Sequence, residues 1–127
     1  YIDEAAALRA LGFQGRLLVV GPAQPELYPS AHESAAELTI GSWHDLDAWV
    51  AAKQRPALHL KFDTGMARQG FLPDDAPRVF DLVEKQGGIR KIAGLSTHFA
   101  TVEDVTEQDY ANLQLSRFQQ VEGMFLH

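Results

Sequence analysis

Residues 57–71 read Ala-Leu-His-Leu-Lys-Phe-Asp-Thr-Gly-Met-Ala-Arg-Gln-Gly-Phe and contain the clearest strand pattern in the chain. The first seven residues alternate between apolar and polar side chains, and successive side chains of a strand point to opposite faces. One face therefore holds Leu58, Leu60 and Phe62, and the other holds His59, Lys61 and Asp63. We predict a strand over Ala57–Asp63 with one polar face.

Strands and helices alternate on both sides of this stretch. We predict further strands over Arg16–Val20, Glu37–Ile40 and Ile92–Phe99. The predicted helices begin near Asp3, which is a candidate N-cap, at Ser42, at Asp74 or Asp75, and near Thr106. Residues 22–34 contain three prolines and predict a loop with a short helix. In the last helix we expect a buried stripe of Tyr110, Leu113, Phe118, Val121 and Phe125.

This order of elements indicates an α/β fold with parallel strands and right-handed crossovers. An open doubly wound sheet and part of a (β/α)8 barrel both have this pattern. A whole barrel needs about 250 residues, so 127 residues supply about half of one. No GxGxxG or GxxxxGK[ST] loop follows a predicted strand, which disfavours dinucleotide and nucleoside triphosphate binding.

Polar residues gather on one face of two predicted strands. Lys61 lies on such a face, and a buried lysine is costly unless it is paired. In the fourth strand Gly94, Ser96 and His98 share a face. Arg68 follows a strand's carboxyl end, where sites of α/β proteins gather. Lys61 also fits a surface lysine whose ammonium reaches solvent, and His98 fits a structural histidine.

The composition narrows the possible partners and compartment. The chain has 11 basic and 17 acidic residues, a net charge of −6 and no basic stripe, which disfavours nucleic acid and membrane surfaces. No apolar run is long enough to span a membrane. Cysteine is absent, which excludes disulfides and thiolate metal sites and fits the cytoplasm. We expect no metal site.

Two blocks carry a resemblance to a known family. Residues 60–71, LKFDTGMARQGF, resemble the LKxDTGMxRxGF signature of alanine racemases, and residues 94–100, GLSTHFA, resemble the GxxTHFA strand of the same family. Residues 3–21 also resemble a family passage, so that the likeness covers nearly the whole chain. It implies a partial (β/α)8 barrel, about half of one, and pyridoxal 5′-phosphate as the cofactor.

The resemblance also implies roles for three residues. Arg68 matches the arginine that reaches the phenolic oxygen of the cofactor and the substrate carboxylate. Lys61 matches a lysine that many members carry in carbamylated form, where it positions the arginine. His98 matches a histidine that lines the cofactor pocket. Asp63, Thr64, Gly65 and Met66 shape the turn before Arg68, while Gln69 departs from the leucine common at its position.

Other family motifs have no counterpart in residues 1–127. The Schiff-base lysine of the first barrel strand and the tyrosine base of the C-terminal β domain are not matched. The resemblance therefore implies that residues 1–127 are a fragment of the N-terminal barrel domain, inactive alone, of a homodimeric enzyme that interconverts L- and D-alanine. We expect its open edges to associate.

Three other functions stay open. One is a racemase of the same fold for serine or a broader set of amino acids, because the substrate pocket draws on other parts of such enzymes. Another is a non-catalytic protein that binds pyridoxal phosphate in a similar barrel. The third is a flavodoxin-like binding or signalling module.

Overall fold

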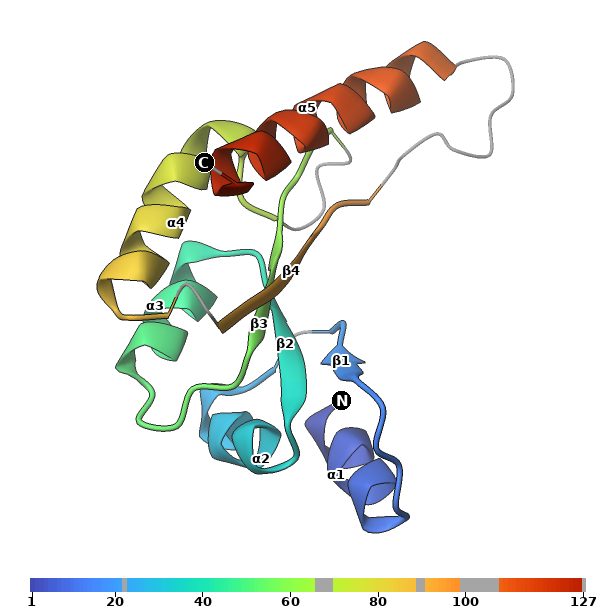
Figure 1. The fold of residues 1–127 in the computed structure, drawn as a ribbon, viewed down its shortest axis with the longest axis vertical. Helices are drawn as coiled ribbons and strands as arrows, with labels where there is room; N and C mark the ends of the chain where they lie inside the picture. The colour runs from blue at the N-terminus through green and yellow to red at the C-terminus, as the bar shows by residue number, and fades with distance from the viewer. Residues whose placement is uncertain (22, 66–69, 89–90, 99–107, 127) are drawn as a thin grey trace.

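The fold is seen in a computed structural model, which describes all residues except 22, 66–69, 89–90, 99–107 and 127. Strands and helices alternate along the chain (Figure 1). Their bounds are α1 Ile2–Ala10, β1 Leu17–Val19, η1 Pro25–Leu27, α2 Tyr28–Glu33, β2 Ala36–Ile40, α3 Trp43–Ala51, β3 Leu58–Lys61, η2 Pro73–Asp75, α4 Ala76–Lys85, β4 Ile92–Ser96 and α5 Gln108–Leu126.

The four strands form one parallel sheet in the order β1-β2-β3-β4. Because every strand runs in the same direction, all carboxyl ends meet at one edge, which we call the carboxyl edge. Each neighbouring pair is also consecutive in the chain, as in a (β/α)8 barrel. The predicted fold class, a partial barrel with parallel strands, is confirmed.

The sheet is curved enough to bring its two end strands together through one side chain. Arg16, just before β1, donates a hydrogen bond from its guanidinium to the carbonyl oxygen of Ala93 in β4, at 3.3 Å. These strands are the two ends of the sheet. A contact between them across the sheet's concave face is the geometry of a barrel wall, and it favours the barrel over the open doubly wound sheet.

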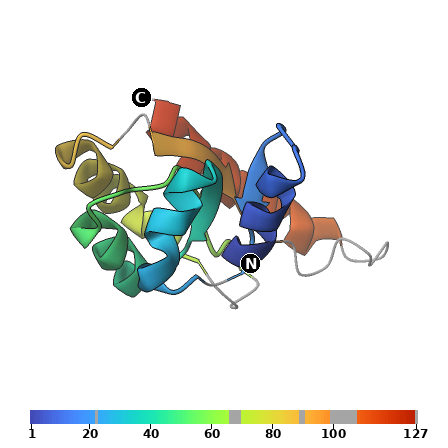
Figure 2. The same cartoon turned by 90° about the horizontal axis from the view of Figure 1, so that it is seen from below.

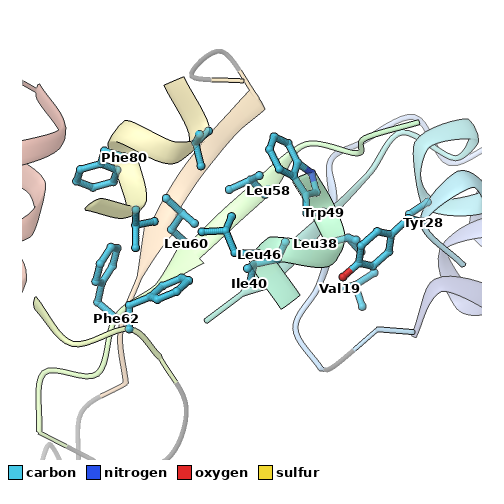
Figure 3. Packing of buried hydrophobic residues seen from close by; sticks show 14 of the residues in the cluster. Val19, Tyr28, Leu38, Ile40, Leu46, Trp49, Leu58, Leu60, Phe62 and Phe80 are labelled. Atoms are coloured by element: carbon cyan, nitrogen blue, oxygen red, sulfur yellow. The ribbon is translucent and has the colours of Figure 1, made fainter. Parts of the chain in front are cut away.

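One face of the sheet packs on helices and forms the core (Figure 3). Leu38, Leu58, Leu60 and Phe62 are buried there, and Trp49 of α3 is buried against them. The indole Nε1 of Trp49 donates to the carbonyl oxygen of Pro56 at 2.9 Å, which satisfies its one polar atom. Figure 2 shows α2, α3 and α4 grouped together beside the strands.

The other face, which we call the inner face, carries the polar residues. Cross-strand partners in register share a face, so Thr39 lies beside His59, His59 beside Gly94, and Lys61 beside Ser96. These side chains are mostly half-buried. The inner face is the lumen side of the partial barrel, and the described residues cover it only in part.

The strand bounds differ from the predicted ones: β1 and β3 are shorter at both ends, β2 begins at Ala36, and β4 ends at Ser96. Two helices also differ from the predictions. Helix α1 begins at Ile2, so Asp3 lies in the first turn and is not the N-cap. The stripe of α5 is also displaced, because Leu113 is exposed while Gln114 is fully buried. Val121 is buried, as predicted, whereas Phe118 and Phe125 are only half-buried; the side chain of Tyr110 lies outside the described residues.

Candidate functional site

The site predicted from sequence lies at the carboxyl edge of β3 and β4. Lys61 is the last residue of β3, half-buried on the inner face. His98 follows β4 by two residues, and its side chain is exposed. Because Lys61 pairs with Ser96 across the two strands, Lys61 and His98 belong to the same edge. Arg68 lies outside the described residues, so its role stays a prediction.

A tight turn follows Lys61. The backbone N–H of Gly65 donates to the Asp63 carboxylate at 2.9 Å, which closes a local turn. Thr64 between them is buried, with 1% of its surface exposed, and its hydroxyl bonds the Thr97 hydroxyl at 2.7 Å. The predicted role of Asp63–Gly65 is to shape the turn before Arg68, and the hydrogen bonds of this turn are compatible with that role.

The segment that begins at this turn returns to the sheet at Gly70 and Phe71. Phe71 donates its N–H to the carbonyl oxygen of Lys61 at 2.9 Å and accepts from the N–H of Asp63 at 2.8 Å. Gly70 has φ +140°, and a Cβ there would lie 2.6 Å from the Asp63 nitrogen. Glycine is therefore required, and both ends of the segment are fixed to β3.

Helix α5 contacts the same edge from outside the sheet. The Gln114 amide donates to the carbonyl oxygen of His98 at 3.1 Å, and the Arg117 guanidinium donates to the carbonyl oxygen of Thr64 at 3.1 Å. Neither residue was predicted from the sequence to contact this edge. A glutamine at the centre of an otherwise apolar helical stripe was the signal that could have found Gln114.

A charged network occupies the inner face nearer the strands' amino ends. Arg16 donates in a fork to the Glu37 carboxylate, at 2.9 and 3.0 Å, and the His59 imidazole contacts the same carboxylate at 2.7 Å. The Arg16 hydrogen bond, with a further contribution from His59, lowers the pKa of Glu37, although partial burial opposes the shift. The same pairing raises the pKa of Arg16.

This network was missed from the sequence because its members are far apart in the chain. His59 lies over Gly94, where an added Cβ would come within 2.5 Å of the imidazole. The network links β2 and β3, through Glu37 and His59, to the residue that precedes β1. The signal in the sequence was that two predicted strands, which are neighbours in the sheet, each carry a polar residue, Glu37 and His59.

The described residues contain neither a metal-binding cluster nor a membrane-spanning helix. Among the described residues, no three His, Cys, Asp or Glu side chains lie close enough to hold a metal ion together. In the same part of the chain, no helix has the length and apolar character needed to cross a bilayer.

The arrangement at the carboxyl edge suits an anionic ligand that needs orientation. Lys61 and His98 lie at the ends of two neighbouring strands, and Asp63 and Phe71, on either side of the segment that contains Arg68 in the sequence, are hydrogen-bonded to each other. Guanidinium, ammonium and imidazole groups bind carboxylate or phenolate oxygens through charge-assisted hydrogen bonds.

Comparison with known proteins gives a consistent result. Residues 1–125 match the family model described as the N-terminal domain of alanine racemase. The alanine racemase of Streptococcus pneumoniae strain 70585 is 33% identical over 124 residues, which cover 94% of this chain and 33% of that protein. That of Geobacillus kaustophilus is 34% identical over 122 residues, or 93% of this chain and 31% of the relative.

Solved structures share the fold. The alanine racemase from E. faecalis superposes with a TM-score of 0.81 at 25% identity, covering 98% of this chain and 34% of that one. The Bacillus anthracis alanine racemase with bound L-Ala-P gives a TM-score of 0.75 at 27% identity, over 96% of this chain and 32% of that one. The chain thus spans about a third of the length of the relatives it matches.

Proposed function

The chain belongs to the alanine racemase family, through its N-terminal domain, and we propose that it forms one wall of the cofactor pocket of a pyridoxal-phosphate-dependent racemase. The proposed reaction is the interconversion of L- and D-alanine. The observation that carries the proposal is the position of Lys61 and His98, which come from the two signature blocks and lie at one edge of neighbouring strands.

We propose that the rest of the enzyme lies outside residues 1–127. The relatives are about three times longer than the matched segment. The remaining barrel strands, with the lysine that holds the cofactor, and a C-terminal β domain with the second base would complete a homodimeric cytoplasmic enzyme. Residues 1–127 alone would then have no racemase activity.

The described residues suit pyridoxal phosphate. The inner face at the carboxyl edge is polar and half-buried, and the small side chain of Ser96 lies beside Lys61. His98 is exposed at the same edge and supplies an imidazole. When bound, the cofactor supplies the electron sink that makes the Cα proton of an amino acid acidic.

We propose that this wall binds and orients the cofactor and the substrate. Arg68 would donate to the phenolic oxygen and to the substrate carboxylate, since guanidinium stays charged and donates in a fixed fork. Lys61 would hold Arg68 after reacting with CO2: the neutral Nζ amine adds to the carbon of CO2 and releases one proton. The product is a carbamate anion where the cation had been, and an anion pairs with Arg68. His98 would line the ring.

Cofactor binding and activity of the full-length protein that contains residues 1–127 test the proposal. We expect it to bind pyridoxal phosphate, with a visible absorption band, and to racemise alanine. Arg68→Lys should keep the charge but lose the fork, and we expect kcat to fall by about 10²-fold or more. Carbon-13 NMR of the native protein equilibrated with 13C-labelled bicarbonate should show a carbamate carbon in wild type and none in Lys61→Ala. A wild-type protein that binds no pyridoxal phosphate would refute the proposal.

The same assay distinguishes the alternatives. Faster turnover of serine than of alanine would identify the serine or broad-specificity racemase. Cofactor binding without turnover of any amino acid would identify the non-catalytic barrel protein.

A further inference from the structure

Gln114 is a polar residue at a buried position of α5, where an apolar side chain is usual. It is 0% exposed, on the side of α5 that packs on the body of the protein with Ala111 and Val121. A buried amide costs free energy unless it is hydrogen-bonded, so an apolar residue would pack α5 at lower cost. The Gln114 amide donates to the carbonyl oxygen of His98, 16 residues earlier in the chain.

Arg117, three residues later, makes the equivalent contact with the backbone that follows β3. Residues three apart lie on one side of a helix, so Gln114 and Arg117 can both reach the carboxyl edge of the sheet. The Arg117 guanidinium donates to the carbonyl oxygen of Thr64, the buried residue of the turn that follows β3. Helix α5 therefore holds the backbone just beyond β3 and just beyond β4 (Figure 1).

The two strand ends are also bonded to each other. The hydroxyls of Thr64 and Thr97 lie 2.7 Å apart, and the N–H of Phe62 donates to the carbonyl oxygen of Ser96 at 2.9 Å. The contacts from Gln114, Arg117 and the threonine pair thus form one connected network. A shift of α5 would reach both ends through it.

We propose that Gln114 and Arg117 are positioning residues for the cofactor wall. They fix the backbone of His98 and of the Asp63–Gly65 turn, and through these they set where the carboxyl edge presents its side chains. This inference rests on the proposed function for what is positioned. The network itself is a property of the described residues. A site held within about 0.5 Å needs such support around the residues that touch the ligand.

Hydrogen exchange on the cofactor-free full-length protein tests the network without using activity. In Gln114→Met, which keeps the side-chain length and removes the donor, amides of Thr64, Gly65, Thr97 and His98 should exchange about tenfold faster, as expected for one lost hydrogen bond. Core amides of Leu38 and Ile40 should stay within about twofold of wild type. Gln119→Leu, an exposed glutamine of the same helix, is the matched control.

Arg117 provides a rescue test. Arg117→Met should speed exchange at Thr64 and Gly65 more than at His98, and Arg117→Lys should restore part of the protection because it retains one donor. Unchanged exchange at both strand ends in Gln114→Met and Arg117→Met would overturn the proposal. Equal acceleration at Leu38 and Ile40 would also overturn it, because it would show that α5 only adds global stability.

Cofactor titration provides the second measurement. We expect Gln114→Met to weaken pyridoxal phosphate binding about tenfold and to move the visible absorption band, while Gln119→Leu does neither. Unchanged affinity and spectrum, in a wild type that binds the cofactor, would overturn the positioning role. If wild type binds no cofactor, the proposed function fails, and the exchange rates still decide whether Gln114 and Arg117 fix the strand ends.

Discussion

At Gly70 the backbone conformation and the space around it both require glycine. The φ of +140° disfavours any L side chain, and a Cβ would meet backbone atoms, at 2.6 Å from the Asp63 nitrogen and 2.8 Å from the Phe62 carbonyl carbon. Backbone atoms cannot rotate away as a side chain can. The close approach also includes Gly41, where an added Cβ would lie 3.0 Å from the Gly70 Cα.

We predict that Gly70→Ala lowers the free energy of unfolding by about 3 kcal/mol, from backbone strain and overpacking together. Urea denaturation followed by circular dichroism measures it. Gly123→Ala is the matched control, because a Cβ at Gly123 meets nothing within 4 Å and the residue lies inside α5. There we expect a gain of about 0.5–1 kcal/mol. Equal effects at the two glycines would contradict the close approach.

Glu37 makes stability depend on pH. Arg16 and His59 lower the pKa of this carboxyl below its ordinary value of 4.5. A carboxyl whose pKa is lowered by folding stabilises the protein fully above the unfolded value, and that contribution is lost as the pH falls below 4.5 through the folded value. We predict that Glu37→Gln lowers the free energy of unfolding by about 1 kcal/mol at pH 7.

The difference between Glu37→Gln and wild type should narrow as the pH falls below 4.5, because wild type then loses the ionised contact. Chemical denaturation between pH 3 and pH 7 measures the slope. Glu122→Gln, at an exposed carboxylate of α5, is the control, and its difference from wild type should stay within about 0.5 kcal/mol at every pH. A constant difference for Glu37→Gln would contradict the lowered pKa.

The sequence suggested candidate site residues but not the contacts that support the strand ends. Lys61, Arg68 and His98 lie in blocks whose spacing is fixed within short stretches, so local pattern is enough to find them. Arg16, Glu37 and His59 meet only through the register of three strands, and Gln114 meets His98 only through the packing of a helix. These contacts are set by tertiary structure, which periodicity within one segment does not record.

At the scale of elements, the start of α3 was predicted correctly, whereas the buried side of a helix is harder to predict. Ser42 was predicted to begin a helix, and its side chain accepts from the N–H of Asp45 at 3.1 Å, at the start of α3. In α1, Ile2 and Ala5 are buried, whereas Leu8, at helical spacing from Ala5, is 41% exposed. Helical spacing indicates which residues share a face, but the neighbouring elements decide which face is covered.

We predict that Ser42→Ala lowers the free energy of unfolding by about 1 kcal/mol, because a first-turn N–H loses its acceptor. Ser116→Ala on the exposed side of α5 is the control, and there alanine should be neutral or slightly stabilising. Thermal melts of both variants measure the difference. An equal change in melting temperature at the two serines would show that the cap contributes nothing to α3.

Arg55 joins the carboxyl ends of two neighbouring helices, α3 and α4. Its guanidinium donates to the carbonyl oxygens of Val50, at 2.5 Å, and of Gln86, at 3.3 Å, which lie at the ends of α3 and α4. It also packs over the Trp49 ring, 5.3 Å from the centroid. One side chain therefore satisfies carbonyls that neither helix satisfies internally. Contacts of this kind fix neighbouring βα units to each other.

For the molecule as a whole, the sheet has two ends. Within the described residues, β1 and β4 each pair with one strand only. Beside β4 a pocket of about 290 Å3 is lined mainly by apolar residues, among them Ile92, Leu95 and Phe118. Next to β1, Val20 is 66% exposed. Open strand edges bordered by apolar surface favour pairing with another chain.

We therefore predict that a sample whose intact mass corresponds to residues 1–127 elutes as a dimer or larger oligomer in gel filtration, and that its size falls on dilution. Val20→Lys should shift it toward monomer, since a charge beside β1 opposes edge pairing. Leu72→Lys is the matched control, because Leu72 is 60% exposed but follows β3 away from both sheet ends. A monomer at high concentration would contradict two open edges, and equal shifts in both variants would place the contact elsewhere.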